Sequence, residues 1–431
     1  MKQKIGILNL GCPRNLVDAE GLAGRLDFKD YSIVDDIAQA GVVLVNTCAF
    51  IQEAKRESID AILDLVQLKK QGKLKKIIVY GCLAQRYKNL AKDLPEVDAF
   101  VGRLGLNHES THSTGSGLMV SEVEPSKRFA LTPKHYAYLK ICEGCVNQCS
   151  YCVIPKIKGR LESLDEQTII RKVKRFNRQK ISELNIIGQD ITGFGIDTCG
   201  ESQLPGLLRK IISQAPDIGW IRLLYLNPQR ITSELLELMA SSAQICKYID
   251  LPIQHINNRI LKLMHRAITK EEIIALIKKI RKIIPGVYLR TSLIVGFPSE
   301  TEKEFNELLE FIQEAKFDRL GAFIYSREEG TPAFNFKGQI PQRLKQKRFD
   351  KIMSAQRQIA AGENAKFLNK TISVLVEEKQ DGAYIGRSQG DAPEVDGVVY
   401  INTRQLLKIG KFEQVRITDT LEYDLVGEVK S

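Results

Sequence analysis

Three closely spaced cysteines are the residues of this chain with the clearest chemical potential. Cys145, Cys149 and Cys152 follow the spacing C-x3-C-x2-C, after an apolar run at residues 135–141. Cysteine thiolates are the usual ligands of iron–sulfur clusters, so three of them on one tight loop can hold three irons of a 4Fe-4S cluster. The fourth iron then has no protein ligand, and such an open coordination site is where substrate chemistry can take place.

A zinc ribbon is the alternative for the same loop. Cys142 with Cys145, and Cys149 with Cys152, form two pairs that resemble zinc knuckles. Zinc ribbons separate their knuckles by about 15–20 residues, whereas only three residues intervene here. The spacing therefore favours a cluster.

Three further cysteines each follow a predicted strand in residues 1–110, where strands alternate with helical patterns. The predicted strands are 5–10, 42–45, 76–80 and 99–101. This alternation predicts a doubly wound parallel sheet, in which ligands bind outside the carboxyl ends of the strands. Cys12, Cys48 and Cys82 occupy those ends, so we expect them to converge on one edge. Buried structural cysteines are the alternative, but the shared position favours a second cluster.

Residues 133–366 again alternate strands and helices. The strand-like runs lie at 136–141, 184–187, 220–226, 248–251, 288–295 and 320–325. Six such units predict a partial (β/α)6 barrel, an open relative of the eight-stranded barrel, whose active sites lie at the strand C-termini.

Polar residues after these strands are candidate site residues. Gln189, after the second strand, is placed to contact a cofactor, whereas Asp190 beside it is equally suited to shaping its loop. His255, after the fourth strand, either lines the cavity or is a hydrogen-bonded structural histidine. Cys142 and Cys246 lie within strand-like runs, so we expect them to be core residues; Cys199 belongs to neither set.

The flanking segments complete the predicted organisation. Residues 111–132, rich in Ser, Thr and Gly, have linker composition, and a basic helix over 342–368 presents either a solvated face or a partner-binding one. Residues 367–431 contain short strands typical of a small antiparallel β-barrel of the OB kind.

Composition and charge limit the function classes. The chain has 431 residues, 43% of them hydrophobic, and a net charge of +11. No apolar run approaches the ~20 residues of a membrane span, and the first residues lack the pattern of a signal peptide. Nine cysteines in such a chain indicate metal or catalytic use in a reducing cytoplasm rather than disulfides.

The charge is unevenly distributed. Residues 371–431 carry eleven acidic and seven basic side chains, a net charge of −4 that leaves +15 on the remainder. Nucleic-acid binders concentrate positive charge, so this segment is better suited to a basic protein surface. A solvated acidic surface is the alternative.

The cysteine loop, with Tyr151 before its last cysteine, is similar to the signature of radical S-adenosylmethionine (SAM) enzymes. Together with the strand-end cysteines and the terminal β-barrel, the chain resembles the methylthiotransferase family, which carries an N-terminal cluster domain and a C-terminal TRAM domain. Within that family it is similar to the RimO type in residues 10–18, 248–255, 325–333, 386–388 and 391–397. Arg14 stands where lysine is usual, and Asn227 where tyrosine is common.

The resemblance implies an activity. Cys145, Cys149 and Cys152 would hold a radical-generating 4Fe-4S cluster that cleaves SAM, with Tyr151 and Gln189 near the cofactor. Cys12, Cys48 and Cys82 would hold an auxiliary 4Fe-4S cluster carrying the sulfur. SAM would serve as radical source and methyl donor, and the product would be an aspartate of small-subunit ribosomal protein S-twelve methylthiolated at its β-carbon. The partners implied are that protein, free or in the subunit, and an electron donor such as a flavodoxin or ferredoxin.

Two rival readings remain at this point. A tRNA adenosine methylthiotransferase of the MiaB type has the same architecture but typically carries Arg-Pro-Gly where this chain has Glu328, Glu329 and Gly330. A non-catalytic iron–sulfur protein would need no open iron.

Overall fold

A parallel sheet forms the N-terminal part of the computed structural model, which describes residues 2–26, 30–103 and 129–429. Its strand order is β2-β1-β3-β4-β5, and all four pairings are parallel. The strands are β1 (Gln3–Asn9), β2 (Tyr31–Val34), β3 (Val42–Thr47), β4 (Lys76–Gly81) and β5 (Ala99–Val101). β2 was not predicted from the sequence, because it has only four residues and just one of them is fully buried.

The helices of this domain follow from the apolar pattern. Helix α2, for example, buries Ile62, Leu65 and Val66 on one face, at the spacing of a helix that covers a sheet. The helices are α1 (Pro13–Ala23), α2 (Gln52–Lys70), α3 (Cys82–Arg86) and α4 (Leu90–Asp93). The predicted doubly wound sheet is therefore confirmed.

The central part is the predicted partial barrel of six parallel strands. They are β6 (Tyr136–Lys140), β9 (Glu183–Ile187), β10 (Trp220–Leu223), β11 (Tyr248–Asp250), β12 (Tyr288–Val295) and β13 (Arg319–Ile324). The pairings are parallel in two three-stranded runs, β6-β9-β10 and β11-β12-β13, which the parallel bridge between Ile221 and Ile245 connects. β6 and β13 are the two edges of the open barrel.

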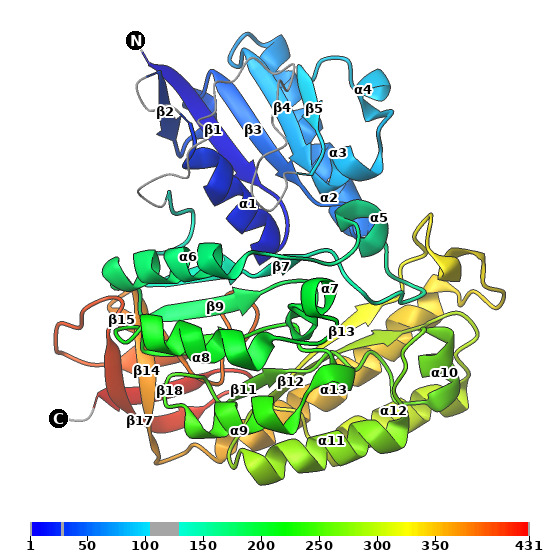
Figure 1. Ribbon diagram of the computed structural model, residues 1–431, viewed down its shortest axis with the longest axis vertical. Helices are drawn as coiled ribbons and strands as arrows, with labels where there is room; N and C mark the ends of the chain where they lie inside the picture. Colours follow the sequence, from blue (N-terminus) through cyan, green and yellow to red (C-terminus); the bar gives the residue numbers. More distant parts are fainter. Residues whose placement is uncertain (1, 27–29, 104–128, 430–431) are drawn as a thin grey trace.

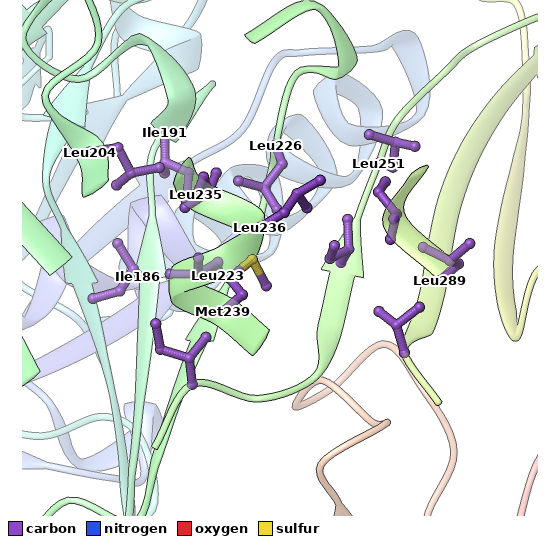
Figure 2. Packing of buried hydrophobic residues seen from close by; sticks show 14 of the residues in the cluster. Ile186, Ile191, Leu204, Leu223, Leu226, Leu235, Leu236, Met239, Leu251 and Leu289 are labelled. Carbon is purple, nitrogen blue, oxygen red and sulfur yellow. The ribbon is translucent and has the colours of Figure 1, made fainter. Parts of the chain in front are cut away.

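Helices cover the outer face of these strands (Figure 1). They are α6 (Glu166–Arg178), α8 (Leu204–Gln214), α9 (Ser233–Ser241), α11 (Lys270–Ile283), α12 (Glu302–Ala315) and α13 (Gln342–Ala365). Figure 2 shows the core between them, where Leu235, Leu236 and Met239 of α9 pack with Leu223 of β10. A short helix that was not predicted, α10 (Asn258–Leu263), follows β11.

The last segment is a closed five-stranded barrel of order β14-β15-β16-β18-β17. Its strands are β14 (Thr371–Gln380), β15 (Ala383–Ser388), β16 (Val399–Asn402), β17 (Phe412–Thr420) and β18 (Leu425–Val429). Four pairings are antiparallel as predicted, but β16 and β18 pair in parallel, because β17 carries the chain back between them.

The small barrel covers the end of the central barrel at which the six central strands begin. This end, called the bottom below, lies at the left of Figure 1. The first residue of every one of the six strands interacts with the small barrel or its loops. The pairs are Tyr136–Glu394, Glu183–Arg387, Trp220–Phe412, Tyr248–Asp396, Tyr288–Ser388 and Arg319–Asp391.

The N-terminal domain lies beside the barrel, at the top of Figure 1, with its helix α1 against edge strand β6. Asp18 of α1, Glu143 of β7 (Cys142–Glu143), Lys140 of β6 and Lys158 of α5 (Ile154–Lys158) form a buried ring of four ion pairs between the two domains. All four side chains are at most 7% exposed. This neutral ring fixes the orientation of the N-terminal domain on the barrel.

A second contact joins the same two domains. Arg86 of α3 pairs with Glu328 at 2.9 Å and donates to the carbonyl of Glu329 at 3.0 Å. The acidic pair after β13 therefore holds the N-terminal domain. No helix among the described residues is long and apolar enough to cross a membrane. The predicted linker lies mostly outside the described residues.

Candidate iron–sulfur site

The three N-terminal cysteines lie together beyond the carboxyl ends of β1, β3 and β4. Cys12 precedes α1, Cys48 follows β3, and Cys82 begins α3. The Oδ1 atom of Asn15 lies 3.7 Å from the sulfur of Cys12 and 3.9 Å from that of Cys82. The Cβ of Cys48 would lie 3.1 Å from a Cβ built on Gly11. The structure thus brings these widely separated residues to one edge.

The backbone before Cys82 explains how the thiols come so close. Gly81 has a φ of +96°, a conformation that side chains rarely adopt. A Cβ at this position would lie 2.6 Å from the Asn46 side chain and 3.0 Å from the Thr47 carbonyl. Only glycine allows β4 to turn into α3 against β3, and that turn carries Cys82 toward its partners.

The thiols of this set differ in their electrostatics. Burial raises the pKa of the Cys82 thiol to about 12, with smaller contributions from Cys48 and Cys12. Burial also acts on Cys12, but the Arg14 guanidinium, whose Nε donates to its sulfur at 3.4 Å, brings the pKa of Cys12 below its ordinary value. The thiolate is the form that binds metal, so Arg14 favours the ligand form of Cys12.

The second set lies on a loop that a short antiparallel pair closes at its base. β7 (Cys142–Glu143) pairs with β8 (Glu162–Ser163), so the residues before and after the loop are held side by side. Ser150 anchors the middle, donating from its hydroxyl to the Leu263 carbonyl at 2.7 Å and from its amide to that of Met264 at 3.1 Å. The loop therefore has a defined shape.

Donors surround the sulfurs of this loop. The backbone and side-chain nitrogens of Asn147 lie 3.4 and 3.3 Å from the Cys145 sulfur, and the Arg266 guanidinium lies 3.9 Å from that of Cys149. Burial raises the pKa of the Cys152 thiol to about 12. Hydrogen bonds to sulfur are among the features that tune a cluster, and these donors are positioned to provide them.

A polar triad that the sequence did not reveal stands next to Cys145. Asp190 accepts from Asn147 and from Arg230, each at 2.8 Å, and Arg230 also donates to the Asn147 amide oxygen at 2.8 Å. Asp190 also caps its own loop through the Thr192 amide. Arg230 gives no signal in the sequence, because it belongs to a short 3-10 helix after β10 and reaches the site only in the folded barrel.

Arg14 connects the two cysteine sets. Its Nη1 atom donates to the carbonyl of Gly188, after β9, at 2.9 Å, and its guanidinium lies 4.6 Å from the ring centroid of Tyr225, after β10. Tyr225 has a φ of +65°, a strained conformation typical of functional sites. Arg14 also counteracts the rise in the pKa of the Cys152 thiol caused by burial. One side chain therefore acts on both sets.

The remaining predicted residues have distinct positions. Gln189 follows β9, and its Oε1 atom is buried without a hydrogen-bond partner among the described residues. Tyr151 lies in the cysteine loop beside the Cys149 thiol, and burial raises its pKa. Gln189 is therefore free to accept a bond from a bound group, whereas Tyr151 packs against a hydrophobic cluster that includes Ile260 and Met264.

His255 is a buried histidine whose Nε2 atom has no hydrogen-bond partner among the described residues. It is fully buried, its Nδ1 atom accepts from the Asn257 amide at 3.0 Å, and burial lowers its pKa to about 4. Cys142 and Cys246 are core residues as predicted, at most 1% exposed, whereas Cys199 is exposed.

Within the described ranges, no group of three His, Cys, Asp or Glu side chains could hold one metal ion. A cluster differs, since each thiolate binds a separate iron. Cys142, which the zinc alternative would need as a ligand, is fully buried and donates to the Asp190 carbonyl.

Comparisons with known proteins match the three parts of the chain. A family described as "uncharacterized protein family UPF0004" matches residues 4–102, the radical SAM superfamily matches 139–312, and the TRAM domain matches 370–429. The ribosomal protein uS12 methylthiotransferase RimO of Desulforamulus reducens is 45% identical over 99% of both chains. The protein of the same name from Clostridioides difficile is 44% identical over 99% of this chain and 98% of its own.

A solved structure supports the fold alone. The radical SAM methyltransferase TsrM from Kitasatospora setae, bound to cobalamin and a [4Fe-4S] cluster, superposes with a TM-score of 0.55 at 14% identity, over 77% of each chain.

Proposed function

Because this chain belongs to the ribosomal protein uS12 methylthiotransferases of the RimO family of radical SAM enzymes, we propose that it adds a methylthio group to the β-carbon of an aspartate in that ribosomal protein. The observation that carries the proposal is the position of Arg14. It bonds the Cys12 sulfur on one side and the Gly188 carbonyl at the mouth of the barrel on the other. The sulfur-bearing set and the radical-generating set can therefore serve one substrate position.

The target bond explains why radical chemistry is needed. A C–H bond β to a carboxylate is too weakly acidic for a histidine or glutamate to remove the proton. His255, the histidine after β11, is fully buried and its Nδ1 atom accepts from the Asn257 amide, so it is not exposed to a substrate. This favours hydrogen-atom removal over proton removal.

Two 4Fe-4S clusters are part of the proposal. Cys145, Cys149 and Cys152 hold one, and a second set of three holds the other: Cys12, Cys48 and Cys82. When bound, these clusters and SAM supply the radical, the sulfur and the methyl group.

The protein's own groups have defined tasks around them. Asn147 and Arg230, joined through Asp190, present donors beside Cys145 that can orient the amino acid part of SAM. Gln189 adds an unpartnered acceptor, and Tyr151 supports the cysteine loop. Cys82 is buried and Cys152 is half-buried, so both lie where a site closed to water would protect reactive intermediates.

The domain division and partners follow from the same assignment. We assign residues 1–110 to the auxiliary-cluster domain, 111–132 to a linker, 133–366 to the radical SAM barrel and 367–431 to the TRAM barrel. The acidic TRAM barrel, with its net charge of −4 over residues 371–431, suits a basic ribosomal protein through charge complementarity. Cluster reduction requires a donor, for which a flavodoxin or ferredoxin is the class we infer, and the site of action is the cytoplasm.

One assay tests the proposal against the tRNA alternative. The purified, reconstituted enzyme is incubated with SAM, a reductant and either ribosomal protein uS12 or tRNA, and the products are analysed by mass spectrometry. We expect a methylthio group on one aspartate of the protein and none on tRNA. Product on tRNA alone would end the assignment, and a SAM-silent cluster spectrum would favour the non-catalytic reading.

A further inference from the structure

The loop between β15 and β16, residues 389–398, spans the open side of the central barrel from below. Asp391 accepts from Arg319, the first residue of edge strand β13, at 2.6 Å. Glu394 accepts from the hydroxyl of Tyr136, the first residue of the other edge strand β6, at 3.0 Å. The 389–398 loop therefore connects both edges of the barrel.

A third anchor secures the loop between these edges. Asp396 accepts from the Tyr248 hydroxyl of β11 at 2.6 Å and from Arg290 of β12 at 3.3 Å. Its carboxylate also accepts from the Ala392 amide at 2.9 Å, which closes the loop on itself. Asp391 and Asp396, on either side of the tip, thus both bond residues of the central barrel.

The tip of the loop, formed by Glu394 and Val395, is exposed to solvent, unlike the residues that precede it. Glu394 is exposed although it bonds Tyr136, and Val395 is 57% exposed, whereas Asp391 and Ala392 are at most 1% exposed. Glu394 also has a φ of +69°, a conformation that costs free energy for a residue with a side chain. Glu394 anchors the loop through Tyr136, but Asp391 and Asp396 provide their anchors without a positive φ.

The direction of the tip follows from strand alternation. Tyr136 and Tyr138 lie on one face of β6, while Ala137 and Leu139 face the core under the helices. After burial, the Glu394 carboxylate is the next largest cause of the raised pKa values of both tyrosines. Glu394 therefore faces the interior side of β6.

An exposed aromatic residue lies on the interior face of the opposite edge. Arg319 and Phe323 are on the same face of β13, because they are four residues apart in a strand. Arg319 contacts the loop, so this face is the interior one, and Phe323 is 51% exposed on it. The Glu394 carboxylate and the exposed Phe323 thus lie on the interior faces of the two edge strands, and the exposed Val395 is next to Glu394 in the loop.

We propose that the tip of the 389–398 loop reads the protein substrate inside the barrel. The Glu394 carboxylate pairs with a basic side chain close to the target aspartate, and Val395 and Phe323 contact an apolar neighbour of that aspartate. This assignment rests on the proposed function, and it gives the TRAM barrel a role in choosing the modified residue as well as in binding the partner. The occupant is a basic segment of the substrate, since an acidic one would be repelled.

Steady-state kinetics with the reconstituted enzyme test the assignment. Glu394→Gln keeps the size and the backbone strain but removes the charge. We expect KM for ribosomal protein uS12 to rise about tenfold, the effect of losing one charge-assisted bond, while kcat changes less than twofold. Asp381→Asn is the matched control, because Asp381 is an exposed acid of the same barrel with a positive φ of +49°; it leaves KM unchanged. Iron content and thermal melting of each variant report folding.

A charge reversal identifies the partner residue. Substrate peptides in which each basic residue near the aspartate is replaced in turn by glutamate are compared on the wild type and on Glu394→Lys. One peptide is expected to be poor on the wild type and to recover at least fivefold on the variant. Equal losses on all peptides, or an unchanged KM for Glu394→Gln, overturn the inference. If the wild type itself fails on ribosomal protein uS12, the proposed function fails instead.

Discussion

The two ends of the central barrel are built in opposite ways. At the top, where the strands end, lie the two sets of thiols and a few donors, and single side chains such as Arg14 bridge the two domains. At the bottom, the first residue of every strand is paired with the small barrel, largely through buried ions and hydrogen bonds. In barrels of this kind the top carries chemistry and the bottom carries stability. Mutations at the top should therefore affect the chemistry, and mutations at the bottom should affect the stability.

The largest expected effect concerns the top. Cys149→Ala removes one ligand of the loop set, and we expect loss of both SAM cleavage and methylthio transfer by at least about 10³-fold, since the chemistry depends wholly on the bound group. Cys48→Ala should abolish methylthio transfer while SAM cleavage persists. 5′-Deoxyadenosine and modified protein, measured by liquid chromatography and mass spectrometry, distinguish the two. Equal loss of both products in the two variants would contradict separate roles for the sets.

The next effect concerns the bottom. Glu183 is fully buried and pairs with Arg222 and Arg387, whose charges lower its pKa against the effect of burial. Glu183→Gln removes the carboxylate that pairs with Arg222 and leaves Arg387 with Glu377 alone, so we expect a loss of about 3–5 kcal/mol in the free energy of unfolding. Denaturant melts measure it. Glu234→Gln, which breaks an exposed pair with Arg209, is the control and should cost under about 1 kcal/mol.

The stability contributed by the bottom of the barrel should also depend on pH. Glu377, which bonds Arg387 and His135 at the bottom, is largely buried, but these partners bring its pKa down to about 2 from 4.5. Because the folded pKa lies below the unfolded one, this stability is present above pH 4.5 and is lost as the pH falls toward 2. It amounts to about 3 kcal/mol. The free energy of unfolding, measured between pH 4.5 and pH 2, should depend less on pH in Glu377→Gln than in the wild type. The same pH dependence in both proteins would contradict a role for the Glu377 carboxylate.

The smallest effect returns to the top. Arg14→Ala removes the bond to Gly188 and the contact with Tyr225, while the ion-pair ring around Asp18 still holds the domains. We expect the ratio of modified protein to 5′-deoxyadenosine to fall about tenfold, as the loss of one charged hydrogen bond suggests. Arg14→Lys retains the charge and should fall less. An unchanged ratio in Arg14→Ala would show that the residue does not align the two sets.

What could be predicted from the sequence follows the same division. Cys145, Cys149 and Cys152 are adjacent in the chain, so their spacing alone indicates a shared site. Cys12, Cys48 and Cys82 required one further rule, that parallel strands end at one edge. Both steps use local patterns, and the structure brings each set together.

Other features depend on how separate units pack. Arg230 and Tyr225 reach the site only once the barrel has formed, and the insertion of Glu394 under the barrel joins segments far apart in the chain. No periodicity or spacing reports such contacts. β2 and α10 were missed for a different reason: they are too short for a pattern to stand out.

The ring formed by Asp18, Lys140, Glu143 and Lys158 has an evolutionary consequence. Its two acids and two amines are mutually compensating, so replacing one member alone would strand an opposite charge out of water. Inherited changes at these four positions should therefore occur in concert, and an alignment of relatives would reveal them as a covarying group drawn from two domains. Shuffling the N-terminal domain between distant relatives should accordingly succeed only when the matching barrel residues travel with it.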